Sequence, residues 1–325
     1  IVVNLPEDVN DVCEFFKKYT IGDLRSLFKA AKTNKSMSYV QFCEVLDKWL
    51  LLPDKNVIKI MTASLIAHHF ESDPLWLFLI APSSGSKTEI LSATSDLPFI
   101  YFLSNLTPQT FISGMNLKND PSLLLELNNK ILVMKDFTTV LSMYRDARQD
   151  LLSQLREIYD GKYSKAFGSG RKPLHWEGRI GFLAGVTTII DTHYSIYQVM
   201  GERFIQYRIT QPDPEEMALM AMDRVGQENE MRKELRESYK KYFLSINIPS
   251  IKEIELPDDI KKAMSSLASF SVLMRSGIIR DTYKHQIEYI PQPEAPTRLS
   301  KQLVVLIKAL AVIEERRKVT WLDYF

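Results

Sequence analysis

Four short runs of apolar residues, separated by stretches with helical periodicity, limit the folds available to this chain more than any other feature. The runs lie at residues 75–80, 99–103, 130–134 and 180–186. Compact apolar runs bounded by turn-forming or polar residues are typical of strands buried on both faces. Because helical segments such as Leu141 to Tyr159 separate them, we expect an α/β domain built on a mainly parallel sheet.

Helical segments precede and follow this α/β region. In the first part of the chain, apolar residues recur every three or four positions in the segments Val9 to Tyr19, Ile21 to Ala31 and Ser38 to Leu51. After about residue 208 prolines separate three more such segments, Glu215 to Phe243, Asp258 to Ser276 and Arg298 to Arg317. The sequence therefore predicts an N-terminal helical segment (1–70), an α/β core (71–210) and a helical lid domain (211–325).

Composition restricts the partners and the compartment. The formal net charge is +1, so any contact with nucleic acid has to come from a local basic surface. Cys13 and Cys43 are the only cysteines, which argues against structural zinc or a disulfide scaffold and favours a cytoplasmic location. No apolar run reaches the ~20 residues that span a bilayer, so we expect no membrane partner. The chain opens without Met and stops within a helical pattern, and we expect it to be the core of a longer polypeptide.

A short Ser- and Gly-containing turn follows the first apolar run and opens a helix. This strand–turn–helix context is the one that a phosphate-binding loop requires. Lys87 would lie over the β- and γ-phosphates, and the Thr88 hydroxyl would hold Mg²⁺. The pattern GxxxxGK[ST] is matched with small residues in place of both glycines; the alternative is an ordinary Ser-rich turn. The predicted nucleotide-binding residues are Ala81, Pro82, Ser83, Ser84, Gly85, Ser86, Lys87 and Thr88.

A carboxylate stands at the end of the third apolar run. Asp136 lies where Mg²⁺ and an attacking water need an acid, downstream of the predicted phosphate loop. Such sites usually carry two adjacent acids, whereas here Lys135 precedes Asp136. Asp136 is therefore either the metal-side acid or the residue in the catalytic-base position, and a third interpretation is that it caps the following helix.

The segment 160–179 combines glycines with basic and aromatic residues. A turn at Gly168 to Gly170 predicts the tip of a β-hairpin. Basic and aromatic side chains on a protruding hairpin suit contacts with DNA phosphates and stacking on bases or sugars. A solvated basic loop is the alternative. The predicted DNA-binding residues are Lys165, Arg171, Lys172 and His175.

Three further polar residues follow the hairpin at positions suited to catalysis. Thr187 ends the fourth apolar run, where a side chain can orient the water that attacks a γ-phosphate. Arg203 precedes an apolar stretch and could reach the γ-phosphate of a neighbouring subunit, although lone arginines are usually surface ion-pair partners. Arg298 opens a helix, where the helix dipole is unfavourable for a cation. This placement hints at an anionic ligand.

Taken in order, these segments resemble the MCM-like helicases within the AAA+ class of P-loop ATPases, over residues 75 to 325. That family also has a small non-Gly residue before the phosphate-loop Lys, as Ser86 here. Its Asp-Glu-Phe strand end places Asp136 at the glutamate, and its sensor Asn lies at Thr187. Its DNA-contacting hairpin corresponds to Lys165 to Lys172, its trans-acting Arg to Arg203, and its lid Arg to Arg298. The chain also resembles ATPases of phages and integrated mobile elements.

The resemblance implies a ring, expected to be a hexamer, that hydrolyses ATP with Mg²⁺ and moves along or unwinds DNA. Single-stranded DNA would lie in the central channel. Lys87, Thr88 and Asp136 would act in cis, Arg203 in trans, and Arg298 from either side. The chain departs from the family in its single acid, in Thr187, and in the short segment Thr107 to Asn129. Alternatives are an ATPase that loads or packages DNA, and a nucleotide-gated assembly or regulatory protein with a protein client.

Overall fold

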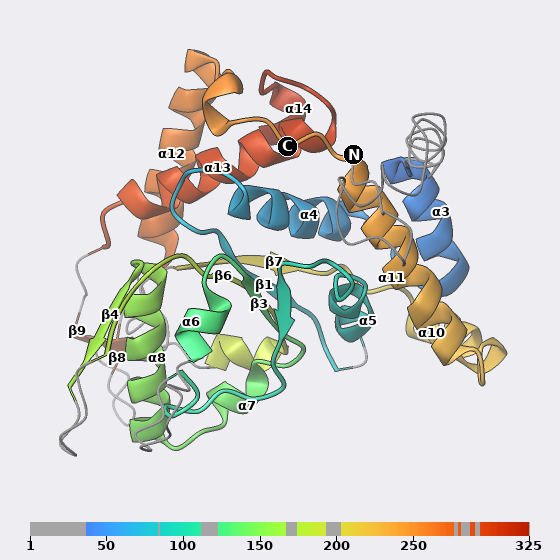
Figure 1. Ribbon diagram of the computed structural model, residues 1–325, viewed down its shortest axis with the longest axis horizontal. Helices are drawn as coiled ribbons and strands as arrows, with labels where there is room; N and C mark the ends of the chain where they lie inside the picture. Colours follow the sequence, from blue (N-terminus) through green and yellow to red (C-terminus); the bar gives the residue numbers. More distant parts are fainter. Residues whose placement is uncertain are drawn as a thin grey trace, which may run out of the picture.

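The fold is an α/β architecture around a five-stranded parallel sheet (Figure 1). The computed structural model describes residues 37–83, 85–111, 123–166, 174–192, 203–275, 279–280, 287–289 and 293–324. The sheet has the order β2-β3-β6-β1-β7, and all of its pairings are parallel. Its strands are β1 (Trp76–Ile80), β2 (Ile100–Phe102), β3 (Ile131–Met134), β6 (Gly181–Val186) and β7 (Phe204–Arg208). The four predicted apolar runs are thus confirmed as strands, whereas β7 was not predicted.

Side chains that alternate along each strand divide the interior into two apolar clusters, one on each face of the sheet. Leu77 and Leu79 of β1 face the first cluster, while Phe78 and Ile80 face the second. β1, β3 and β6 are buried along their whole length, as the apolar runs predict.

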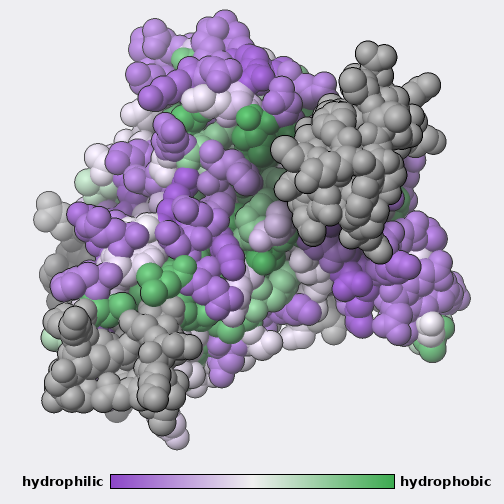
Figure 2. Space-filling view, viewed as in Figure 1, coloured by the Kyte–Doolittle hydropathy of each residue, from purple (hydrophilic) through white to green (hydrophobic). Residues whose placement is uncertain are grey.

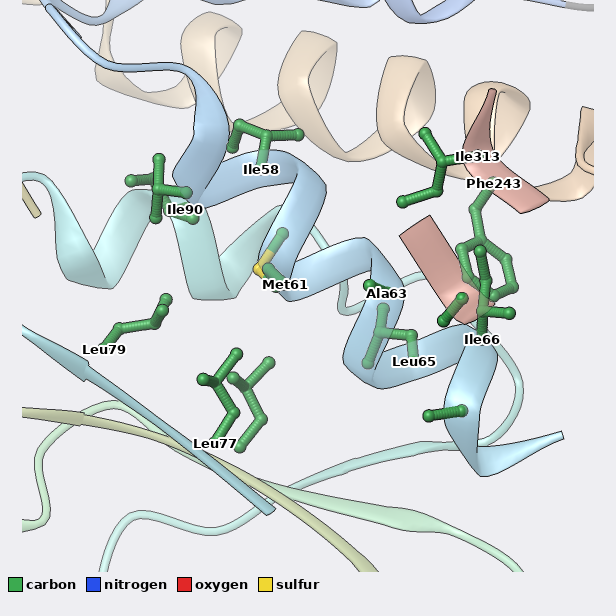
Figure 3. Close-up of a cluster of buried hydrophobic side chains, with 14 of the residues drawn as sticks. Ile58, Met61, Ala63, Leu65, Ile66, Leu77, Leu79, Ile90, Phe243 and Ile313 are labelled. Atoms are coloured by element: carbon green, nitrogen blue, oxygen red, sulfur yellow. The ribbon is translucent and has the colours of Figure 1, made fainter. Parts of the chain in front are cut away.

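Six helices contribute to the first cluster. α4 is the most buried of these, since ten of its thirteen residues are buried. A helix that is apolar around its whole circumference has to be covered on all sides. Figure 3 shows Met61 and Leu65 of α4 in the same cluster as Leu77 and Leu79 of β1 and Phe243 of α11. The six helices are α3 (Tyr39–Trp49), α4 (Asn56–His68), α5 (Lys87–Ser92), α11 (Glu228–Ser245), α12 (Asp258–Arg275) and α13 (Thr297–Ile313).

The second cluster lies under three helices and a β-hairpin. The helices are α6 (Leu123–Leu127), α7 (Thr138–Leu141) and α8 (Arg145–Tyr159). Strands β4 (Lys162–Lys165) and β5 (Leu174–Glu177) pair antiparallel, as the predicted hairpin requires, and its predicted tip at Gly168 to Gly170 lies outside the described residues. Aromatic rings fill the centre of this cluster, with Phe78 stacked on Phe204 at a centroid distance of 3.8 Å.

The remaining elements lie after β6 and β7. The predicted helix 215–243 is two helices, α10 (Pro214–Asp223) and α11, separated near Gly226. The other elements are η1 (Thr188–Thr192), η2 (Ile251–Glu253), α12 (Asp258–Arg275), β8 (Ile279–Arg280), β9 (Ile287–Tyr289) and α14 (Trp321–Tyr324). None of the helices within the described residues is both long and apolar enough to cross a membrane.

The boundary expected at residue 70 does not coincide with a break in packing. α4 contacts β1, β6 and α13, and its side chains belong to the same core as the strands. Within the described residues, the segment from Met37 onward is therefore part of the α/β core and not a separate unit.

Candidate functional site

The parallel sheet brings three of the predicted site segments to one edge. β6 lies between β1 and β3, so the residues that follow these three strands are neighbours at the carboxyl edge of the sheet. The Ala81 amide donates to the Val186 carbonyl at 3.2 Å, and the Phe137 amide donates to the Gly185 carbonyl at 2.7 Å. In open α/β sheets, ligands bind at this edge.

Lys87 folds back across the turn that precedes it. Its ammonium donates to the carbonyl oxygens of Ala81 at 2.6 Å and Pro82 at 2.5 Å, and only 7% of the residue is exposed. Burial lowers the pKa of Lys87, while the nearby Asp136 carboxylate opposes that shift. A lysine ammonium has three donors, so one remains for a ligand bound over the turn.

The turn itself is tight. Gly85 is buried, and a Cβ there would lie 2.9 Å from Gln211 Oε1 and 3.0 Å from the Pro82 carbonyl. Ser86 has φ 59° and ψ −4°, the left-handed conformation that favours glycine. The pattern GxxxxGK has its second glycine at this position. Ser83 is exposed, and Ser84 lies outside the described residues.

Thr88 and Asp136 fit the predicted magnesium site by their chemistry and exposure. Thr88 is exposed in the first turn of α5, and Asp136 is exposed beyond the end of β3. Asp136 Oδ1 accepts a hydrogen bond from the Thr138 amide at 2.8 Å, so the carboxylate also caps the start of α7. Since a carboxylate has two oxygens, capping leaves one for another ligand.

Two threonines join the ends of β3 and β6. The hydroxyls of Thr138 and Thr187 are 3.2 Å apart, and the Thr187 amide donates to Thr138 Oγ1 at 3.4 Å. Thr138 was not identified from the sequence, because nothing local marks a threonine that meets a strand 49 residues later. Gly185 permits the close approach, since a Cβ there would lie 2.6 Å from the Lys135 carbonyl.

A cavity of about 260 Å³ lies beside the loop and was also missed by sequence reasoning. Three segments line it: the end of α3 and the residues after it, Ser86, and the α10–α11 region. Most of its wall is apolar, including Trp49, Leu50, Met217 and Met231. Glu234 of α11 fixes one wall, since it accepts from the Trp49 indole at 2.7 Å and from Lys48 at 2.6 Å.

Arg203 lies at the opposite, amino edge of the sheet. It precedes Phe204, the first residue of β7, which pairs with Trp76 at the start of β1. Arg203 is 4% exposed. Its guanidinium forms an ion pair with the Asp160 carboxylate at 2.7 Å and lies over the Tyr159 ring. Burial lowers the pKa of Arg203. In this conformation, Arg203 does not present its guanidinium to a neighbouring subunit.

Arg298 lies near Arg203 and not beside Lys87. The first turns of α13 reach β7, because Gln302 donates to the Arg203 carbonyl at 2.8 Å. The positive charge of Arg298 adds to the lowering of the pKa of Arg203. Arg298 pairs with Glu294 at 2.5 Å, four residues earlier. A role for Arg298 at the loop of its own chain is therefore excluded by this arrangement.

The hairpin differs from expectation in its aromatic residues. Tyr163 and Trp176 were expected to stack on DNA, but both are buried in the second apolar cluster. The outward side chains pair with each other: Lys162 with Glu177 at 3.3 Å, and Ser164 with His175 at 2.9 Å.

The remaining basic residues of the hairpin segment fall into three groups. Lys165 is half-buried in β4, while Arg171 and Lys172 lie outside the described residues. Arg179 has a structural contact, since its guanidinium donates to the carbonyls of Ala67, at 2.9 Å, and Phe70 at the end of α4. A cation at this end of a helix is favourable.

Comparison with known proteins adds no family to these observations. No protein-family model matches this chain, and no curated protein matches it either.

Proposed function

We propose that the protein binds a nucleoside triphosphate with Mg²⁺ at the carboxyl edge of its sheet and hydrolyses it. The observation that carries the proposal is the position of Lys87, whose ammonium is held over the turn by the carbonyls of Ala81 and Pro82, which within the described residues leaves its third donor for a ligand. The strand–turn–helix context, the left-handed Ser86 and the exposed Asp136 support the same conclusion. The adjacent cavity supports it too, because its apolar wall and Trp49 suit a nucleobase.

Each residue has a role that its geometry permits. Lys87 would neutralise charge on the β- and γ-phosphates, and Thr88 and Asp136 would hold Mg²⁺, which supplies charge neutralisation when bound. Thr187, oriented by the hydroxyl of Thr138, would accept from or donate to the attacking water. Asp136 would polarise that water, because its carboxylate lies close enough to Lys87 to oppose the lowering of the Lys87 pKa.

Replacement of Lys87 tests this proposal. Lys87→Met keeps the length of the side chain but removes the ammonium, so ATP affinity in the presence of Mg²⁺ should fall at least about tenfold. Calorimetric titration measures the affinity directly. Lys135→Met, which removes an exposed cation at the same sheet edge, is the matched control and should bind ATP as the wild type does. Failure of the wild-type protein to bind ATP would exclude the site.

We further propose a ring of subunits acting on DNA, as the sequence resemblance implies. Arg203 and Arg298 lie together at the edge of the sheet opposite Lys87, so either one could complete only the site of a neighbouring copy. Arg203 would first have to leave Asp160. Mixing Lys87→Met with Arg298→Met subunits tests this: recovered ATP turnover indicates a shared site, and no recovery contradicts it.

DNA binding by the hairpin is tested by neutralising Lys165, Arg171 and Lys172 together with glutamine. Affinity for single-stranded DNA should fall, and its dependence on salt should weaken by roughly one counterion per lost contact. The control is the same charge change on the exposed face of α11, at Lys233, Lys240 and Lys241. Equal losses in both variants would show that the hairpin has no special role.

A nucleotide-gated protein with a protein client is the second candidate. Two observations favour it: the single acid at the site already accepts from the Thr138 amide, and the hairpin residues Tyr163 and Trp176 are buried. Slow ATP turnover that DNA does not stimulate would support this candidate over a motor.

A further inference from the structure

Arg224 lines the cavity beside the loop. It directly follows α10 and shares the cavity wall with Ser86, the residue before Lys87, and with Trp49. The side chain is half-buried, and its guanidinium lies over the Trp49 ring, 5.8 Å from the ring centroid. Arg224 is thus the arginine that the same chain supplies to the cavity next to the predicted phosphate-binding turn.

The guanidinium of Arg224 is not fully satisfied. Its Nη1 atom is buried and has no hydrogen-bond partner among the residues that the structure describes. No ion pair joins Arg224 to a carboxylate within the described residues, whereas Arg232 on α11 pairs with Glu89 at 3.0 Å. Burial lowers the pKa of Arg224, and the Asp223 carboxylate opposes that shift. An unpaired buried donor on a permanent cation is costly, and an anion removes that cost.

The joint after Arg224 has room for adjustment. α10 contributes no buried residue, and Gly226 has φ +87° with nothing within 4 Å of a Cβ built there. Both features leave the end of α10 free of the core packing that fixes α11. Arg224 can therefore be carried toward the loop without disrupting either apolar cluster.

We propose that Arg224 binds the phosphate chain of the nucleoside triphosphate in cis, donating from the guanidinium that now lies over Trp49. This inference rests on the proposed function. A triphosphate carries more negative charge than Lys87 and one Mg²⁺ neutralise, and a guanidinium matches phosphate oxygens with paired donors. Trp49 holds the arginine at the cavity before the ligand arrives.

The test is calorimetric titration of ATP, with Mg²⁺, into the wild type, Arg224→Met, Arg224→Lys and Lys87→Met at several salt concentrations. Methionine keeps the apolar contact with Trp49 without the charge. We expect ATP affinity to fall about tenfold in Arg224→Met and less in Arg224→Lys, with a weaker salt dependence in the methionine variant. Arg145→Met, an exposed position on α8, should equal the wild type.

Two results would overturn the inference while leaving the proposed function intact. One is wild-type ATP affinity in Arg224→Met while Lys87→Met loses binding. The other is weaker binding with an unchanged salt dependence, which would make Arg224 part of the apolar wall only. If the wild type itself does not bind ATP, both the proposed function and this inference fail. Thermal unfolding of each variant shows whether a loss of affinity comes from a loss of fold.

Discussion

Ser86 offers a direct test of the geometry of the loop. A non-glycine residue in the left-handed region is strained by about 1–2 kcal/mol, because its Cβ approaches the backbone. Ser86→Gly removes this strain, while the greater freedom of glycine in the unfolded chain costs about 0.4–1 kcal/mol. With φ at 59°, we expect the substitution to raise the free energy of unfolding by about 0.5–1 kcal/mol.

Two further variants make the prediction specific. Ser86→Val should lower the free energy of unfolding by about 1–3 kcal/mol, because a β-branched residue is poorly tolerated at positive φ. Ser153, exposed in the middle of α8, is the matched control. At that position glycine should destabilise by up to about 1 kcal/mol.

Urea unfolding followed by circular dichroism measures these differences, with midpoints compared at equal m-values. The reasoning depends on opposite signs at the two serines. If Ser86→Gly lowers the midpoint as Ser153→Gly does, the left-handed conformation is not present in the folded protein.

Three other perturbations have definite expected outcomes. Gly185→Ala should destabilise the folded protein by about 1–3 kcal/mol in thermal unfolding, because the new Cβ would lie 2.6 Å from the Lys135 carbonyl. An unchanged stability would contradict this close approach. Thr187→Val should leave ATP affinity within about threefold of wild type but lower the turnover rate at least about tenfold, and equal losses of both would point to a structural threonine. Burial lowers the pKa of His68 from 6.5 to about 4, so the unfolded state binds more protons between these values. The free energy of unfolding should therefore be highest above pH 6.5 and fall by up to about 3 kcal/mol toward pH 4. His68→Gln should make the free energy of unfolding depend less on pH in this range. An unchanged pH dependence in that variant would assign it to other groups.

Much of the sheet could be predicted because its signals are local. Three strands, β1, β3 and β6, are apolar runs buried along their whole length, and β2 is a continuous apolar run that is half-buried. The hairpin strands β4 and β5 flank a segment that contains glycines in the sequence. β7 was missed because Gln206 and Arg208 interrupt its apolar sequence, whereas the other edge strand, β2, is a continuous apolar run. Burial on one side leaves a weaker pattern than burial on both.

The candidate site was predictable only where chain neighbours form it. The turn before Lys87 is contiguous in the sequence, and it follows β1 and precedes α5 as the strand–turn–helix pattern predicts. The cavity combines residues 49–51, 86 and 217–231, which no spacing in the sequence brings together. Likewise, the burial of Arg203 depends on Asp160, 43 residues earlier, so a sequence cannot distinguish this arginine from an exposed one.

The contact between α4 and α13 has a consequence for how the protein is made. α4 is apolar on all sides, and the helix that covers it lies more than two hundred residues further along the chain. During translation, the nascent polypeptide therefore emerges with α4 unprotected until the ribosome has released α13. We expect chaperones that hold exposed apolar segments to bind chains whose synthesis pauses between α4 and α13. The yield of folded protein should therefore depend on the rate of elongation.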